Sequence, residues 1–219
     1  MPDWGQHTRR EQERYLDGQE RLPAGADQDA RQRQLARMGN AASGAGLSEL
    51  MKGNTVSANE WFAKAVDRYR ESFELAPPGS WGRPIAVIKA LLIADDWGSA
   101  EAAARWTLEQ GAAEADSPIG HYAATLALLV LARDVEARVL ADGLRTHDDF
   151  PAAVGDALAF IAARDPLGYI EAVESVLRSF ETREGYLEDL PVADTVMVLQ
   201  RLAARRDMAA ELSSPLLPS

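Results

Sequence analysis

The arrangement of side chains with the most evident chemical potential in this chain is His147 followed by Asp148 and Asp149. An imidazole beside two carboxylates could act as a general base or bind a divalent cation. Adjacent residues in a turn seldom converge on one point, however, and a histidine after a helix is also stabilised by the negative end of the helix dipole. We therefore expect no catalysis and no metal here, and we keep an enzyme or metal-binding protein built around His147 as an alternative.

Three other features favour structural roles. Asp95 and Asp96 lie between two expected helices, where a carboxylate caps the following helix. His121 lies on an apolar helix and is expected to pack rather than to bind a ligand. The glycines within 39–46 lack the Gly-Lys-Ser/Thr ending of a phosphate-binding loop. With no cysteine and no known catalytic motif, the sequence predicts no catalytic residue, no metal and no cofactor.

The charge balance limits the class of partner. The chain has 34 acidic residues against 23 lysines and arginines, and residues 1–37 are balanced, so the net charge of −11 lies in residues 38–219. Such a body repels phosphate backbones, so we expect no nucleic acid and a partner with a neutral or basic surface. No apolar run approaches the roughly 20 residues that cross a bilayer. We therefore expect no membrane association and a cytoplasmic location.

The elements that would position these residues are helices in a repeating order. An alanine recurs at spacings of 35, 37 and 35 residues, as Ala65, Ala100, Ala137 and Ala172. An aromatic residue stands three positions earlier in three of the four copies, as Phe62, Trp97 and Tyr169. A period in this range is typical of stacked helical repeats. The alanines are expected to allow close helix packing.

Turn and capping residues mark where the helices begin and end. One helix is expected from about Asp27 to Met51, and the next from a capping box at Ser57 and Glu60. Proline, glycine and aspartate then separate further helices, which are expected at about 84–94, 99–110, 117–133, 134–147, 151–164 and 167–182. A last apolar helix follows Pro191. Nothing alternates with the period of two that strands require, so the fold class is all-α.

Composition divides the chain into three parts. Residues 1–34 form a polar leader that is too poor in apolar residues to fold alone; it is either flexible or forms one polar helix near 8–20 that docks on the body or on a partner. Residues 35–207 form the helical-repeat domain. Residues 208–219 form a C-terminal tail whose proline-rich end is not helical.

Residues 65–77 resemble the second helix of a tetratricopeptide repeat. The small residues Ala65 and Ser72, the aromatic Tyr69 and the helix-ending Pro77 occupy signature positions of that family. The resemblance covers about residues 47–182, with later copies keeping the alanine and the paired helices. It implies antiparallel helix hairpins stacked as a short right-handed solenoid, with the helix after Pro191 as a C-terminal cap.

The resemblance also implies a function. Such solenoids present a concave surface, lined by the first helix of each pair, to a peptide or a folded partner. The family's groove positions fall on Lys89, Tyr122 and Arg164, which become the candidate partner contacts. The sequence therefore predicts a non-enzymatic adaptor or scaffold that binds another protein, and leaves its oligomeric state open.

A second resemblance gives an alternative within the same class. The stretch from Leu190 to Pro218 is similar to the C-terminal end of some all-helical immunity proteins of bacterial polymorphic toxin systems. This resemblance implies an inhibitor that covers the active site of a cognate toxin, often a basic nuclease. An acidic body suits that role because complementary charge speeds association.

Overall fold

The computed structural model describes residues 2–22, 27–186 and 189–218, and over these ranges it contains ten α-helices, one short 3₁₀ helix and no strand. The all-α class predicted from the sequence is confirmed. None of the described helices combines the length and apolar character that a bilayer span requires.

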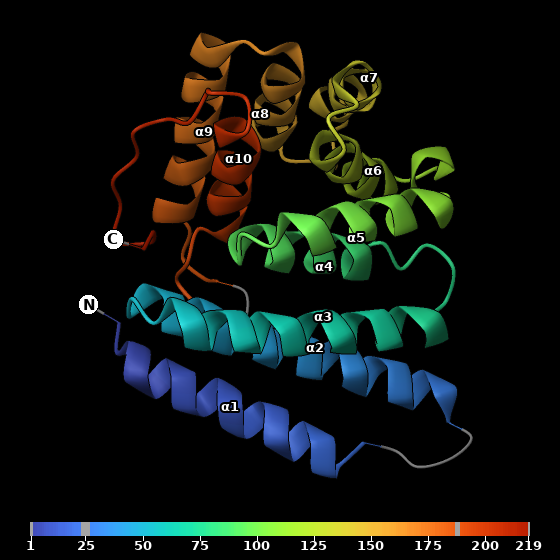
Figure 1. The fold of residues 1–219 in the computed structure, drawn as a ribbon, viewed down its shortest axis with the longest axis vertical. Helices are drawn as coiled ribbons and strands as arrows, with labels where there is room; N and C mark the ends of the chain where they lie inside the picture. Colours follow the sequence, from blue (N-terminus) through green and yellow to red (C-terminus); the bar gives the residue numbers. More distant parts are fainter. Residues whose placement is uncertain (1, 23–26, 187–188, 219) are drawn as a thin grey trace.

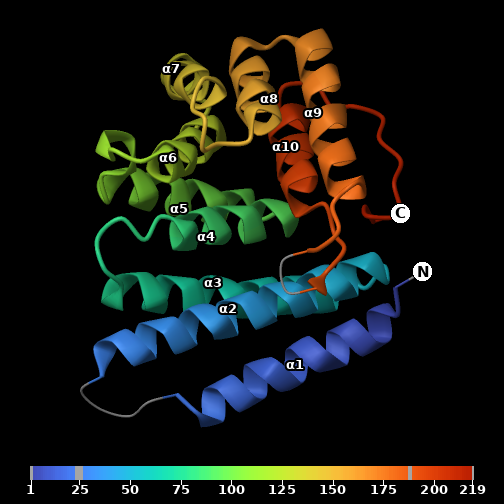
Figure 2. The same cartoon turned by 180° about the vertical axis from the view of Figure 1, so that it is seen from behind.

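The helices follow one another closely along the chain. They are α1 (Trp4–Glu20), α2 (Gln28–Met51), α3 (Thr55–Leu75), α4 (Gly82–Ile93), α5 (Trp97–Glu109), η1 (Ala112–Glu114), α6 (Pro118–Val130), α7 (Asp134–Arg145), α8 (Ala152–Ala163), α9 (Pro166–Glu181) and α10 (Asp194–Ala204). From α1 to α9 each α-helix packs against the next, and α1 lies at one end of the molecule while α8 and α9 lie at the other (Figures 1 and 2). The four repeated alanines are all buried, each in the second helix of a pair.

The polar helix expected near residues 8–20 is α1, which lies along α2 (Figure 1). Tyr15 anchors it: the side chain is buried, its ring meets Trp61 edge-on with centroids 5.5 Å apart, and its hydroxyl accepts a hydrogen bond from Nε of Arg68. The expected boundary at residue 34 falls inside α2, whose start agrees with the helix expected from Asp27: the side chain of Asp27 accepts a hydrogen bond from the backbone N–H of Ala30. The leader is thus α1 and the first turns of α2.

The glycines of α2 mark close helix contacts. A Cβ atom on Gly39 would lie 2.7 Å from the ring of Tyr69, and one on Gly46 would lie 2.8 Å from the ring of Phe62. The two aromatic rings of α3 therefore lie directly on the α2 backbone. Because any side chain there would separate the helices, glycine is required despite its cost to helix stability.

The capping box predicted at Ser57 and Glu60 is wrong. Helix α3 already begins at Thr55, so both residues lie inside it. The reason is the tight end of α2: Gly53 adopts a left-handed conformation with φ +81°, and the N–H of Asn54 returns to the carbonyl of Glu49. This closure turns the chain directly into α3.

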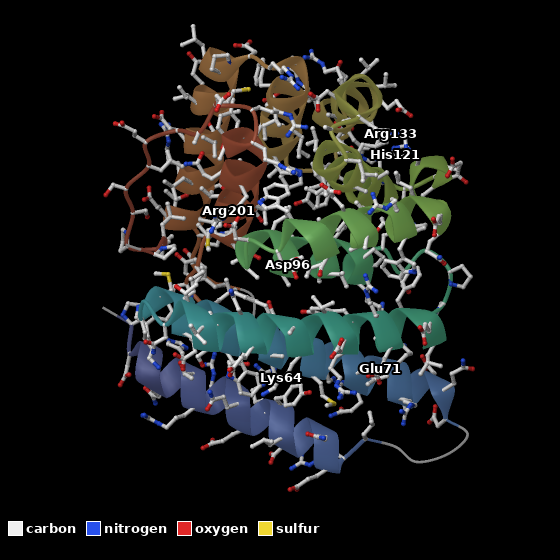
Figure 3. All side chains as sticks on the ribbon, in the orientation of Figure 1. Lys64, Glu71, Asp96, His121, Arg133 and Arg201 are labelled. Carbon is white, nitrogen blue, oxygen red and sulfur yellow. The ribbon has the colours of Figure 1, made fainter. Side chains whose placement is uncertain are left out.

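The last helix expected after Pro191 is α10. It packs against α4 and α8 as well as α9, so its contacts reach well beyond the preceding helix pair (Figures 1 and 2). Its apolar side chains Val196, Leu199 and Leu202 are fully buried. Arg201 on its outer side lies 3.3 Å from Asp95 in the α4–α5 turn, beside the labelled Asp96 in Figure 3. One broad side of α10, with Val196, Val198, Leu199, Leu202 and Ala203, is buried, and its contacts with α4, α8 and α9 provide the surface that covers it.

Candidate functional site

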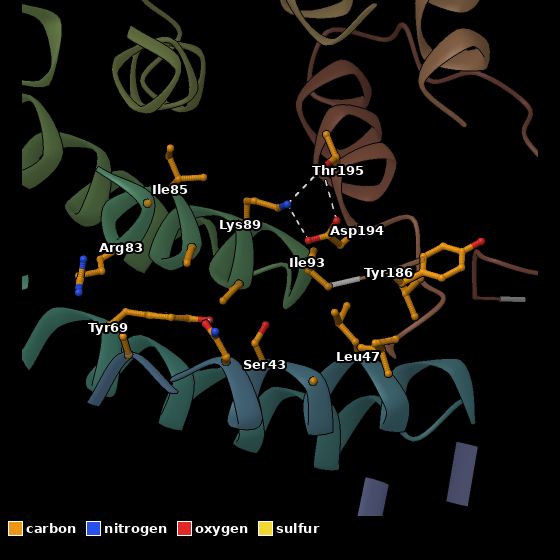
Figure 4. A pocket seen from close by; sticks show the side chains of 18 of the residues that line it. Ser43, Leu47, Tyr69, Arg83, Ile85, Lys89, Ile93, Tyr186, Asp194 and Thr195 are labelled. Carbon is orange, nitrogen blue, oxygen red and sulfur yellow. Dashed lines mark hydrogen bonds and ion pairs between the residues drawn. The ribbon is translucent and has the colours of Figure 1, made fainter. Parts of the chain in front are cut away.

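A cleft of about 540 Å³ lies between α2 and α4 and is bordered by residues from the region 180–195 (Figure 4). The α2 wall consists mainly of small residues at helical spacing: Ala36, Asn40, Ser43, Gly44 and Leu47. The α4 wall alternates small residues, Gly82, Ala86 and Ala90, with the larger Arg83, Ile85, Lys89 and Ile93. Where small residues of the two helices face each other, side chains do not fill the space between the helices.

The predicted residue Lys89 lies in this cleft and is held by α10. Its Nζ is 2.6 Å from Oδ2 of Asp194 and 3.1 Å from Oγ1 of Thr195 (Figure 4). Burial disfavours the charged ammonium, but the carboxylate of Asp194 outweighs it and raises the pKa of Lys89 above its usual value. Lys89 is therefore a protonated donor, not an amine nucleophile.

Arg83 fixes the other end of the cleft. Its Nε donates to Oγ of Ser72 at 2.6 Å, and a terminal N–H donates to the side chain of Gln32. Ser72 in turn donates to the backbone carbonyl of Gln32, so one network joins α2, α3 and α4. The described contacts of Arg83 include no carboxylate, and burial lowers the pKa of its guanidinium.

The cleft has the composition of a binding site. Its described lining residues include no histidine, and the hydroxyl of Tyr69 is already donated to Oδ1 of Asn40 at 2.9 Å. Lys89 and Arg83 are donors set among aliphatic side chains. Apolar walls with a few convergent polar groups are the usual character of ligand and peptide sites.

Neither of the other two predicted contacts lines this cleft, although Tyr122 is close enough to interact electrostatically with Lys89 and Asp194. Tyr122, on α6, packs against Phe150 with ring centroids 5.3 Å apart, and burial raises the pKa of its phenol. Arg164 directly follows α8, and its Nε is 3.1 Å from Oδ2 of Asp134. Arg164 lines a second hollow, separate from the cleft that contains Lys89. As one set of partner contacts, the three residues stay a prediction.

The turn at His147 does not gather its neighbours into a site. The side chain is exposed, and its Nδ1 accepts the backbone N–H of Asp149 at 3.2 Å, as in an ordinary turn. Over the ranges that the structure covers, no three His, Asp or Glu side chains are placed to share a metal ion. The alternative site around His147 gains no support from this geometry.

Sequence reasoning missed the residues that complete the cleft. Asp194 had no distinguishing signal, because an acidic residue in the first turn of a helix is ordinary. Arg83 did have one: a cation in the first turn of a helix, just before Pro84, is electrostatically unfavourable. Such a residue is a reasonable candidate for a special contact.

No protein-family model, curated protein or solved structure matches this chain.

Proposed function

We propose that this chain is a non-enzymatic protein-interaction module, built from tetratricopeptide-like hairpins, that binds a segment of a partner protein in the cleft between α2 and α4. The observation that carries the proposal is the cleft itself, which follows two neighbouring helices and combines aliphatic walls with the donors Lys89 and Arg83. A cleft of this kind suits a short segment with apolar side chains and hydrogen-bond acceptors.

The arrangement of helices supports a repeat origin for the cleft. The pairs α2/α3, α4/α5, α6/α7 and α8/α9 each join two helices by a short connection, and Ala65, Ala100, Ala137 and Ala172 occupy equivalent buried places. In such a stack the first helices, here α2, α4, α6 and α8, line the concave face. Since α10 packs on α4 and α8, the part of that face between α2 and α4 is where a partner could enter.

Charge favours a particular kind of partner. The net charge of −11 favours a partner with a neutral or basic surface overall. Among the described residues that line the cleft, the charged side chains are the cations Arg83, Lys89 and Arg183 and the carboxylate of Asp194. The inserted segment is therefore expected to be neutral and rich in acceptors, while the surrounding partner surface meets the acidic body.

The test fills the cleft without disturbing the rest of the chain. Ala86→Phe places a ring in the cleft, and Ala63→Phe makes the same change on the exposed face of α3. Each tagged protein is used to capture partners from its native lysate at moderate salt, and the affinity of the main partner is then measured with purified components. We expect near-stoichiometric capture by the wild type and by Ala63→Phe, and loss of that partner with Ala86→Phe.

Two other results would count against parts of the proposal. Equal capture by Ala86→Phe would place the partner on another surface of the module. Absence of any stoichiometric protein, even at low salt, would contradict the interaction function itself. Circular dichroism of both variants is the check that a lost partner reflects the cleft and not misfolding.

A further inference from the structure

Four arginines from three elements surround a second hollow of about 320 Å³. We call it the arginine pocket and define it by Arg105 on α5, Arg164 after α8, and Arg205 and Arg206 at the end of α10. Its remaining wall is the apolar end of α6, residues 129–132, together with Glu101. The side chain of Arg206 is 3% exposed, whereas those of Arg105, Arg164 and Arg205 are between 44% and 65% exposed.

The arginine pocket has more positive than negative charge. Glu101 serves two of its arginines, at 4.0 Å from Arg105 and 3.4 Å from Arg205. Asp134 serves the other two, Arg164 and Arg206. Burial alone would raise the pKa of Asp134, but its hydrogen bonds to these arginines lower it, so the carboxylate stays ionised. Two carboxylates shared by four guanidinium groups leave an excess of two positive charges in a chain of net charge −11.

Helix capping does not account for Arg105, Arg164 and Arg205. The helices α6, α8 and α10 all end at the pocket, and their negative ends favour cations. Each end is nevertheless closed by a backbone N–H that returns to a carbonyl five residues earlier: Arg133 to Leu128, Asp165 to Phe160 and Met208 to Ala203. Among the described side-chain contacts of the four arginines, those of Arg206 alone reach helix carbonyls, at Leu129 and Leu202.

The three more exposed arginines retain donors for a ligand. A guanidinium has five N–H groups in a rigid fork, and the described contacts of Arg164 and Arg205 each use one nitrogen. Arg205 is also held in place by Trp97, with its guanidinium carbon 4.2 Å from the ring centroid. Forks fixed by stacking lose little entropy on binding an anion.

We propose that the arginine pocket binds a doubly charged tetrahedral oxyanion, a phosphate ion or the phosphate group of a small phosphorylated molecule. Guanidinium groups that approach from α5, α8 and α10 suit the several oxygens of a phosphate better than the flat pair of a carboxylate. The apolar residues 129–132 offer a surface to the remainder of a phosphorylated molecule. This site is separate from the cleft between α2 and α4 and does not depend on the proposed partner.

The test is isothermal titration of the full chain with inorganic phosphate, glycerol 3-phosphate and acetate at matched ionic strength. We expect one bound phosphate group per chain and acetate at least about tenfold weaker, because charge-assisted bonds from several arginines act together. Tighter binding of the ester would identify a phosphorylated molecule as the ligand, and binding of phosphate alone would identify the free ion. Both outcomes support the pocket.

The variants Arg105→Gln and Arg164→Gln locate the site, because both side chains are exposed enough to be changed without unfolding the chain. Each is expected to weaken phosphate binding about tenfold or more. Arg133→Gln is the matched control, since Arg133 pairs with Glu136 on the surface and does not line the pocket (Figure 3). Amide shifts of the wild type should move near residues 101–105, 129–134, 164 and 205–206.

Three results would overturn the proposal. One is the absence of binding by both phosphate probes at millimolar concentration. Another is binding that Arg105→Gln and Arg164→Gln leave unchanged, which would place the anion elsewhere. The third is acetate binding as tightly as phosphate, which would exclude the doubly charged class.

Discussion

The contact between Lys89 and Asp194 joins α4 to α10 through a charge pair in which both side chains are less than one third exposed. We predict that Asp194→Asn lowers the free energy of unfolding by about 2–4 kcal/mol, because it leaves a largely buried ammonium without its counter-ion. Urea denaturation followed by circular dichroism measures the change. The double variant Lys89→Met/Asp194→Leu should recover most of the loss, since it removes both charges. If Asp194→Asn were as stable as the wild type, the ion pair would contribute no net stability, because water would solvate the Lys89 ammonium equally well.

Asp134 provides a prediction on pH. Hydrogen bonds to Arg206 and Arg164 overcome the effect of burial and lower its pKa in the folded chain. A lowered pKa stabilises the fold above the unfolded value of about 4, and this stabilisation is lost as the pH falls through the folded pKa. We therefore expect Asp134→Asn to be less stable than the wild type near neutral pH, with a gap that narrows in acid. Unfolding free energies of both proteins between about pH 7 and pH 2 test this; a constant gap would contradict it.

At the scale of elements, the contact between α2 and α3 depends on glycine. We predict that Gly46→Ala destabilises the chain by about 1–2 kcal/mol, because the new methyl group meets the buried ring of Phe62 and overpacking outweighs the better helix propensity of alanine. Thermal and urea unfolding measure it. The matched control is Gly143→Ala in α7, where a Cβ would have no neighbour within 4 Å. That change should stabilise by up to about 1 kcal/mol, so equal effects at the two positions would refute the packing argument.

The expected helices and the observed ones agree where the signals were local. Pro84 lies in the first turn of its helix, and Asp96 caps the next by accepting the N–H of Ser99 at 3.0 Å. The capping box predicted at Ser57 and Glu60 was wrong. The same residue pattern can occur inside a helix whose start is determined by the preceding turn. A cap depends on where the previous element ends.

At the scale of the whole molecule, α10 couples the stability of helices that lie far apart in the sequence. In a simple repeat array stability is nearly local, because each unit contacts only its neighbours. Here α10 contacts α4, distant in sequence, as well as α8 and α9. We predict that Leu199→Ala, which empties a fully buried site, costs about 2–5 kcal/mol and raises amide hydrogen exchange in α4 as well as in α9. Exchange that rises in α9 and α10 while α4 stays protected would show that α10 does not link them.

The sequence by itself determined the all-α class, the order of the helices and the buried places of Ala65, Ala100, Ala137 and Ala172. These properties follow from spacings of three and four residues and from turn residues, which act over one or two helical turns. The candidate contacts Lys89, Tyr122 and Arg164 were also predicted from their positions along the helices. Such positions show which helix a residue lies on, but not which residue of another helix it contacts.

Only the tertiary structure decided where α10 lies. Its position also shapes the cleft between α2 and α4 and the arginine pocket. Three features bring together residues that are far apart in the chain. They are the ion pair of Lys89 with Asp194, the cleft between α2 and α4, and the arginine pocket with Arg105, Arg164 and Arg206. The broad apolar side of α10 could be buried against many surfaces, and its sequence does not say which. The choice depends on how the faces of all the helices fit together, which is a property of the packed molecule.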